Sequence, residues 1–167
     1  MSMIVNRRDL DFVLYETLDL ERILESDRYA DHDRESLDAM MDLCQTIAED
    51  QFLPCAAKLD ANEPQFVDGK VETISELKEA IGAYQEAGLC ASAYDLDVGG
   101  MQLPWMMDQA LNGMFVCANN PAHIYLFLTQ GVANMLNACG SDELKRKYLP
   151  NLVDGNWFGT MCLSEPQ

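Results

Sequence analysis

The stretch QALNGMFVCANNPAHIYLFLTQGVANMLNACGS, residues 109–141, contains no Asp, Glu, Lys or Arg, although 23% of the whole chain is charged. Asn120-Pro121 divides this stretch, because proline is favoured in the first turn of a helix, and Gly140 is placed to end it. Residues 124–128, IYLFL, are apolar on every side, which is typical of a buried helix. The stretch therefore predicts a helical hairpin that is covered on most sides. Two uncharged helices also indicate that another domain, another subunit or a ligand packs on them.

The residues before this hairpin are also predicted to be helical. Residues 8–25 place their leucines and a valine near one face, which predicts an amphipathic helix, and the charged residues 26–35 predict a solvated connection. Residues 36–61 predict a second helix, capped by Ser36 and kinked or divided at Pro54.

A loop is predicted at 62–72, and Thr73-Ile-Ser-Glu76 then has the pattern of a capping box that opens a third helix, with Gly88 as its stop. Residues 89–104 predict a second loop, whose Pro104 is suited to the first turn of the next helix.

After the hairpin, Ser141-Asp-Glu143 predicts the capped start of a short helix that ends near Leu149, before Pro150. Residues 157–163, WFGTMCL, are rich in aromatic and apolar residues and predict a strand. A single strand is not stable in water, so we expect its partners to lie beyond residue 167.

Composition narrows the classes of function. The chain has 11 basic and 28 acidic residues, a net charge of −17, which disfavours a nucleic-acid partner. No secretory signal is recognisable, no segment is apolar enough to span a membrane, and the localisation expected is cytoplasmic. The six cysteines form no Cys-x-x-Cys pair, which gives little support to a zinc site. We expect reduced, mostly buried thiols, and a disulfide framework is the weaker alternative.

Most catalytic classes lack support, because the sequence has no glycine-rich phosphate loop and no Gly-x-Ser-x-Gly elbow. His123, in the uncharged stretch, is more often a hydrogen-bonded core residue than a base. The ten methionines fill core gaps or suit a flat aromatic ligand. A strand followed by Ser164-Glu165-Pro166 either enters an ordinary turn or presents backbone groups and a hydroxyl to a flavin ring, and the residues alone favour the turn.

Three segments change that balance. CLSEPQ, residues 162–167, resembles the start of the acyl-CoA dehydrogenase signature. DVGGMQLP, residues 97–104, is similar to a glycine-rich loop of that family, with Gln102 where glycine is usual. CGSDELKRKYLPNLVDG, residues 139–155, resembles a third family motif, with Leu144 where glutamine is common. The opening residues and GTMCLSEPQ look most like the long bacterial branch, which includes the 3-methylmercaptopropionyl-CoA dehydrogenases.

The resemblance implies FAD as cofactor, an acyl-CoA as substrate and α,β-dehydrogenation as the reaction, in fatty acid β-oxidation. It also implies an electron-transfer flavoprotein as partner and a homo-oligomer. It covers nearly this whole chain, but only about the first quarter to third of such a protein. The fold that it implies is mainly α: an N-terminal helical domain that ends in the first strand of the middle β-domain. The corresponding units are an N-terminal extension helix with its charged connection at 1–35, the helical domain at 36–155 and the strand at 156–167.

Site residues follow from the resemblance position by position. Ser164 matches a hydroxyl that bonds near flavin N5, and Met161 and Leu163 match strand positions against the flavin ring. Phe127, Leu128 and Gly131 match the helix that lines the acyl pocket. Gly131 is also explained equally well by close helix packing. The resemblance assigns no catalytic or metal-binding residue to this chain, because the family's catalytic glutamate lies in a later domain.

We therefore expect the N-terminal portion of an FAD-dependent acyl-CoA dehydrogenase, inactive by itself because it lacks the base. The alternative is a free-standing acidic helical module that binds a partner through its uncharged hairpin.

Overall fold

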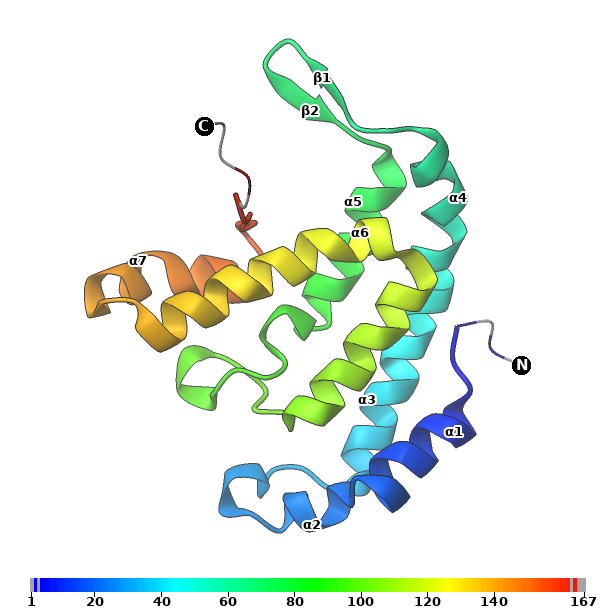
Figure 1. The fold of residues 1–167 in the computed structure, drawn as a ribbon, viewed down its shortest axis with the longest axis vertical. Helices are drawn as coiled ribbons and strands as arrows, with labels where there is room; N and C mark the ends of the chain where they lie inside the picture. The colour runs from blue at the N-terminus through cyan, green and yellow to red at the C-terminus, as the bar shows by residue number, and fades with distance from the viewer. Residues whose placement is uncertain (1, 3, 163, 165–167) are drawn as a thin grey trace.

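The structure is a computed structural model that describes residues 1–167 except residues 1, 3, 163 and 165–167. The elements of the described residues are, in chain order, α1 (Arg7–Asp11), α2 (Leu20–Leu24), α3 (Arg34–Ile47), α4 (Leu53–Ala61), β1 (Gln65–Val67), β2 (Lys70–Glu72), α5 (Ser75–Glu86), α6 (Trp105–Cys139) and α7 (Asp142–Val153). Figure 1 shows α3 and α4 as one long rod, with the first half of α6 beside it and α7 along the second half of α6. The prediction of a mainly helical protein is confirmed.

The predicted single helix at 8–25 is wrong, because the helix is interrupted at Asp19, between a π-helical turn, Phe12–Thr17, and α2. Asp19 has a φ of +53°, a left-handed conformation that aspartate tolerates better than most residues. Leu14 and Leu20 are both buried. Six positions apart in one continuous helix, they would point about 120° away from each other, so the break allows both to reach the core.

Helix α3 begins two residues earlier than predicted, and its cap is Asp33 rather than Ser36. The Asp33 carboxylate accepts the Ser36 N–H at 2.8 Å, and the Ser36 hydroxyl in turn accepts the Asp33 N–H at 2.9 Å. Pro54 divides the rod as predicted: a π-helical turn, Ala48–Phe52, precedes α4, and the proline lies in the first turn of α4.

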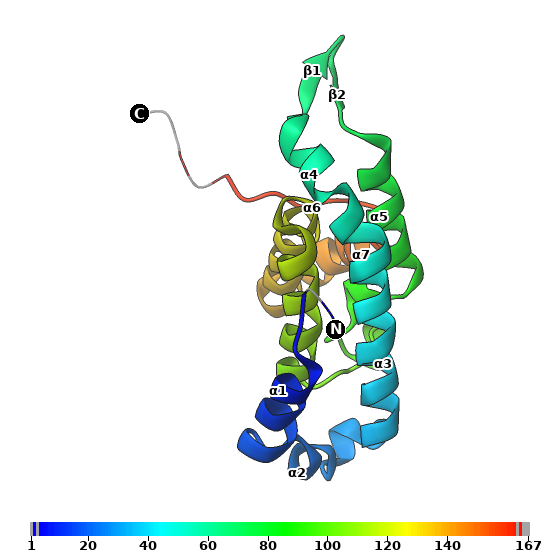
Figure 2. The same cartoon turned by 90° about the vertical axis from the view of Figure 1, so that its right-hand side faces the viewer.

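The predicted loop at 62–72 is wrong, because β1 and β2 pair there as an antiparallel hairpin with Phe66 opposite Val71. Asp68 and Gly69 both have positive φ, at 48° and 80°, as a two-residue hairpin turn requires. All six strand residues are exposed, and Figures 1 and 2 show the hairpin projecting from the helices.

Helix α5 begins without the predicted capping box, because Ile74 occupies the cap position and makes no side-chain bond there. Its predicted stop is confirmed: α5 ends at Glu86, and Gly88 follows with a φ of +72°. The loop predicted at 89–104 is also confirmed, with short 3₁₀ turns at Leu89–Ala91 and Leu96–Val98.

Replacing Gly82 with alanine is expected to raise the free energy of unfolding by about 0.5–1 kcal/mol. Gly82 lies inside α5, and a Cβ built there meets no atom within 4 Å. Gly88→Ala is the matched control, because Gly88 has a left-handed backbone conformation and a Cβ built on it would lie 2.7 Å from the Met101 Cε. We expect that variant to lose about 1–2 kcal/mol. Urea unfolding measures both, and equal effects of the two substitutions would contradict the backbone argument.

The long helix α6 consists of two helical segments, as the sequence predicted, and they meet at Asn119, where the backbone leaves helical geometry. The predicted hairpin is wrong, because the second segment bends away at this kink and does not return beside the first (Figure 1). The Asn119 Oδ1 accepts the Ala122 N–H at 3.1 Å, so Asn119 caps the second helix, one residue before the predicted Asn120. The Asn119 Nδ2 donates to the Phe52 carbonyl at 3.0 Å, which ties the break to the α3–α4 rod.

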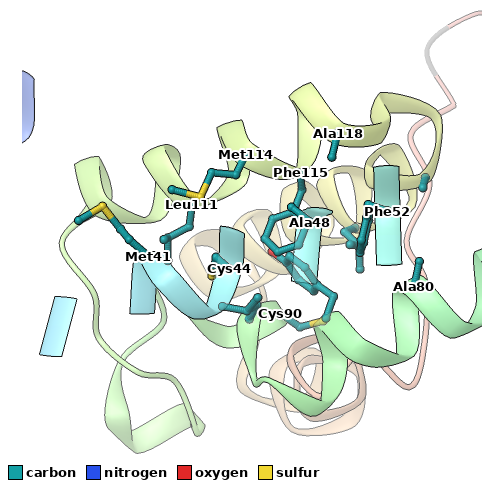
Figure 3. Packing of buried hydrophobic residues seen from close by; sticks show 14 of the residues in the cluster. Met41, Cys44, Ala48, Phe52, Ala80, Cys90, Leu111, Met114, Phe115 and Ala118 are labelled. Atoms are coloured by element: carbon teal, nitrogen blue, oxygen red, sulfur yellow. The ribbon is translucent and has the colours of Figure 1, made fainter. Parts of the chain in front are cut away.

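An aromatic group forms the centre of the core between α3, α5 and α6 (Figure 3). The Phe115 ring meets the Phe52 ring at 4.9 Å and the Tyr84 ring at 4.8 Å between centroids, both edge-on. Met41 and Met114 fill the space beside it and are almost completely buried, as gap-filling methionines should be.

Helix α7 begins as predicted, since the Ser141 hydroxyl accepts the Leu144 N–H at 3.3 Å. Its predicted end at Leu149 is wrong, because the helix continues through Pro150 to Val153. Leu149, Leu152 and Val153 are buried. Their burial offsets the cost of about 3 kcal/mol for a proline inside a helix.

Residues 156–162 leave α7 as an irregular segment, which Figure 2 shows running away from the helices. The predicted strand is not formed within its described part, 157–162, and Leu163 lies outside the described residues. That these residues pair with strands of a following domain stays a prediction.

The six cysteines are free thiols, as predicted. Only half are buried, Cys44, Cys55 and Cys90, so the prediction that most are buried is wrong.

Candidate functional site

An uncharged face with exposed apolar side chains runs along the second half of α6. We call it the outer face and define it by Ile124, Phe127, Leu128, Gly131 and Met135, which follow one another at helical spacing. Phe127 and Met135 are each 60% exposed, and Ile124 is 45% exposed. Part of the stretch 124–128 is therefore exposed in the described chain, and its cover by another domain, another subunit or a ligand stays a prediction.

Gly131 lies in the middle of the outer face and is not explained by packing within the described chain. A Cβ built on Gly131 meets no atom within 4 Å. Of the two explanations that the sequence left open, close helix packing therefore has no partner among the described residues. The space above Gly131 is open to whatever covers this face.

The segment after α7 crosses the second half of α6. The Gly159 N–H donates to the Thr129 hydroxyl at 3.0 Å, and the Phe158 ring meets the Tyr125 ring at 6.3 Å between centroids. Gly159 has to be small, because a Cβ there would lie 2.7 Å from a methyl group of Val132. This contact anchors the segment that leads to Ser164.

The three residues predicted to hold the cofactor are placed only in part. Met161 is 52% exposed and Ser164 is exposed, whereas Leu163 lies outside the described residues. Phe127, Leu128 and Gly131, the predicted acyl-binding residues, do come together on the outer face. No role of these six residues is tested by their positions alone.

A cleft that the sequence did not indicate lies beside Phe158. It has a volume of about 480 Å³, and its walls come from α5, from Tyr125 and from residues 155–158. Lys78 contributes a positive charge to its wall. Tyr125 and Phe158, which both line the cleft, are 33 positions apart, and local sequence patterns do not report such contacts.

A buried polar network joins α5 to the two halves of α6, along a flank of α6 next to the outer face. The Asn112 Oδ1 accepts the Tyr84 hydroxyl at 3.0 Å and lies 3.0 Å from the His123 Nε2. The Asn112 Nδ2 donates to the Asp108 carboxylate at 3.1 Å. The Gln130 amide lies 3.4 Å from the Tyr84 hydroxyl. The interpretation of His123 as a hydrogen-bonded core residue is confirmed.

Burial sets the charge of each group in this network. It lowers the pKa of His123 to about 4 and raises the pKa of Tyr84 well above its usual value, so both side chains are neutral at pH 7. It also raises the pKa of Asp108, while the hydrogen bonds from Ser92, Gln109 and Asn112 oppose that rise. A neutral imidazole that is 2% exposed has no access to a substrate proton, which argues against His123 as a base.

The stability difference between the parent protein and a His123→Gln variant is expected to depend on pH. His123 has a pKa of about 4 when folded and 6.5 when unfolded, so the unfolded chain binds its proton more readily. The stabilisation from a neutral His123 is complete above pH 6.5 and is lost as the pH falls to about 4, by on the order of 3 kcal/mol. Denaturant unfolding of both proteins across this range measures the difference, in which the titration of Asp108 cancels. Parallel stability curves would show that burial does not shift the His123 pKa.

Two further kinds of site are absent from the described residues. They contain no group of three or more His, Cys, Asp or Glu side chains placed to hold a metal ion. None of their helices combines the length and the hydropathy needed to cross a membrane.

Comparison with known proteins identifies the domain. Residues 34–156 match the family model described as acyl-CoA dehydrogenase, N-terminal domain. A butyryl-CoA dehydrogenase of Syntrophomonas wolfei is 30% identical over 165 residues, which are 95% of this chain and 27% of that protein. A 3-methylmercaptopropionyl-CoA dehydrogenase of Ruegeria pomeroyi is 29% identical over 118 residues, 71% of this chain and 20% of that protein.

A solved structure has the same fold. One chain of a structure described as the electron transferring flavoprotein of Acidaminococcus fermentans superposes with a TM-score of 0.63 at 21% identity, covering 81% of this chain and 33% of that one. The chain spans about a quarter of the length of the curated relatives that it matches. Since the family model covers most of its residues, the chain belongs to the acyl-CoA dehydrogenase family, of which it contains the N-terminal domain.

Proposed function

We propose that this domain supplies one wall of the acyl site in an FAD-dependent acyl-CoA dehydrogenase, and that the whole protein catalyses α,β-dehydrogenation of an acyl-CoA thioester. The outer face of α6 is the observation that carries this proposal. A domain with a net charge of −17 exposes an uncharged apolar helix face, and that face holds all three residues that the family resemblance assigns to the acyl chain. The names of the relatives support the same substrate class.

An acyl chain suits the outer face because its recognition needs no charge. Each methylene removed from water contributes about 0.8 kcal/mol. Phe127 offers a large apolar surface, and Gly131 leaves room beside it, so the pair forms a raised and a recessed part of one wall. The acidic surface elsewhere on the domain disfavours the anionic end of the coenzyme, which we place on residues outside this chain.

The end of the described chain carries groups of the kind that can contact FAD. The segment after α7 carries the side chain of Met161 and the hydroxyl of Ser164, both exposed. We propose that the Ser164 hydroxyl donates a hydrogen bond near flavin N5 and that Met161 and Leu163 lie against the ring. When bound, FAD supplies the acceptor for the hydride that leaves the β-carbon.

The α-proton needs a base, and we assign that base to a residue outside this chain. Asp108 and His123 are each buried in the polar network, 2% exposed, and Glu165 belongs to a signature that the family resemblance treats as structural. The isolated chain is therefore expected to be inactive. An electron-transfer flavoprotein as the electron acceptor, a homo-oligomer, a cytoplasmic location and a role in fatty acid β-oxidation are part of the same proposal.

The function is tested on the protein translated from its complete reading frame. We expect it to purify yellow with bound FAD, and its flavin absorbance to bleach anaerobically with butyryl-CoA, octanoyl-CoA or palmitoyl-CoA. A protein that retains no flavin and reduces none when FAD is added contradicts the proposal. An intact mass equal to that of the 167-residue chain would favour the alternative, an acidic helical module that binds a partner through its uncharged hairpin.

Gly131→Leu is expected to shorten the longest acyl chain that the enzyme accepts. The new side chain fills the space of several methylenes, and each methylene that is no longer buried lowers kcat/KM by about fourfold. We expect kcat/KM to fall at least about tenfold for palmitoyl-CoA and to change little for butyryl-CoA. Gly113→Leu is the matched control, because Gly113 lies in the first half of α6 and its Cβ also meets nothing within 4 Å. An unchanged chain-length profile in a folded, FAD-loaded Gly131→Leu enzyme removes Gly131 from the pocket.

A further inference from the structure

Helical hydrogen bonds do not fix how the second half of α6 is rotated relative to the first. At Asn119 the angles φ −162° and ψ 85° interrupt the helix, so the helical ladder does not continue across the break. The rotation matters, because a helix with its side chains has a radius of about 5–6 Å. A turn of about 20° therefore moves a side-chain tip on the outer face by about 2 Å. Side-chain contacts on the buried side have to fix this rotation.

Two such contacts hold the second half of α6 along one flank of the helix, about 100° round from the centre of the outer face. His123 and Gln130 are seven residues apart, which is two helical turns, so they share this flank; His123 is buried and Gln130 is half-buried. His123 lies 3.0 Å from the Asn112 Oδ1, and Gln130 lies 3.4 Å from the Tyr84 hydroxyl. Since Tyr84 itself donates to the Asn112 Oδ1 at 3.0 Å, both contacts lead to the same carboxamide.

Asp108 determines which way that carboxamide points. A carboxylate only accepts hydrogen bonds, and Asp108 already receives the Ser92 hydroxyl and the Gln109 amide, the latter at 3.0 Å. The Asn112 Nδ2 donates to the Asp108 carboxylate at 3.1 Å and to its backbone carbonyl at 3.0 Å. The Asn112 oxygen is therefore left facing Tyr84 and His123. His123 must then carry its proton on Nε2, because only that tautomer donates to this oxygen.

We infer that Asn112 is a positioning residue, whose carboxamide, oriented by Asp108, fixes the rotation of residues 120–139 through His123 and Gln130 and so determines which outer-face side chains meet the acyl chain. The inference rests on the proposed function of the outer face. The network itself is independent of that function, since it depends only on contacts within this chain.

Three variants of the complete protein separate this role from general stability. His123→Leu removes the donor to Asn112, and His123→Gln keeps an amide donor at a similar reach. Gln109→Met is the matched control: it removes a hydrogen bond of 3.0 Å to the same Asp108, but Gln109 makes no link to the second half of α6. Methyl NMR of Ile124 and Met135 reports the outer face directly. Kinetics with butyryl-CoA, octanoyl-CoA and palmitoyl-CoA report its effect on the substrate.

We expect His123→Leu to shift the methyl resonances of Ile124 and Met135. We also expect it to raise KM for octanoyl-CoA about tenfold with kcat within about twofold, because a displaced apolar wall loses uniform binding rather than stabilisation of the transition state. His123→Gln should restore both readouts, and Gln109→Met should alter neither.

Unchanged resonances and kinetics in His123→Leu overturn the inference, and so do equal shifts in Gln109→Met or no restoration by His123→Gln. If His123→Leu does not fold, Gln130→Met makes the same test by removing the longer contact. If His123→Leu shifts the methyl resonances but the parent protein reduces no flavin, the positioning of α6 is supported and the proposed dehydrogenase function is overturned.

Discussion

Replacing Phe115 with alanine lowers the free energy of unfolding by about 3–5 kcal/mol, the range for removing a large aromatic side chain from a core. Phe115 is completely buried, and its ring meets the rings of Phe52 and Tyr84 edge-on at 4.9 and 4.8 Å between centroids. The substitution leaves a cavity where α3, α5 and α6 meet, and rigid aromatic neighbours cannot close it.

Urea or guanidinium unfolding, followed by far-UV circular dichroism, measures this loss. Val116→Ala is the matched control, because Val116 is the next residue of the same helix and is 42% exposed. It should change stability by no more than about 0.5 kcal/mol. A loss below about 1 kcal/mol for Phe115→Ala would mean that the aromatic centre of the core is not packed as described.

Asn119→Ala is expected to lower the free energy of unfolding by about 1.5–3.5 kcal/mol, because one side chain makes two separate contributions. Its Oδ1 caps the second half of α6 through the Ala122 N–H, which is worth about 1–2 kcal/mol. Its Nδ2 donates to the Phe52 carbonyl, a buried hydrogen bond whose loss costs about 0.5–1.5 kcal/mol, since the Cys55 thiol still donates to that carbonyl.

Asn120→Ala is the control for Asn119, since Asn120 is adjacent and exposed. Its effect on the free energy of unfolding should lie within about 0.5 kcal/mol. Asn119→Asp divides the two contributions further, because a carboxylate still accepts the Ala122 N–H but cannot donate to Phe52. Equal losses in the alanine variants of Asn119 and Asn120 would assign the cap to the wrong residue.

Local patterns predicted those features that depend on neighbouring residues. The division of α6, the stop at Gly88 and the cap at Ser141 each follow from residues within one or two turns. The errors have local causes too. The hairpin was missed because strands of three residues carry almost no alternation, although Asp68-Gly69 is the dipeptide that such turns prefer. The predicted end of α7 at Leu149 relied on Pro150 alone, and the local sequence does not show that Leu152 and Val153 are buried.

The candidate site was predicted unevenly. Phe127, Leu128 and Gly131 came from resemblance, and the sequence order of one helix was enough to group them. Which of their sides the rest of this chain covers could not be predicted, because IYLFL is apolar on every side and periodicity cannot distinguish its sides. The partners of His123 could not be found from the sequence, since Tyr84 and Asn112 reach it from a different helix and from across the break in α6.

By itself, the sequence determined that the chain is helical, where most of its helices begin, that its second half contains two uncharged helical segments and which family it resembles. These properties depend on proline, glycine, capping residues and charge, whose effects extend only a few residues along the chain. Only the tertiary structure decided that the two segments form one bent helix, which side of it is buried and which residues orient it. The buried side depends on Phe52 and Tyr84, the orientation on Asp108 and Asn112, and all four act through contacts between segments that only the folded chain brings together.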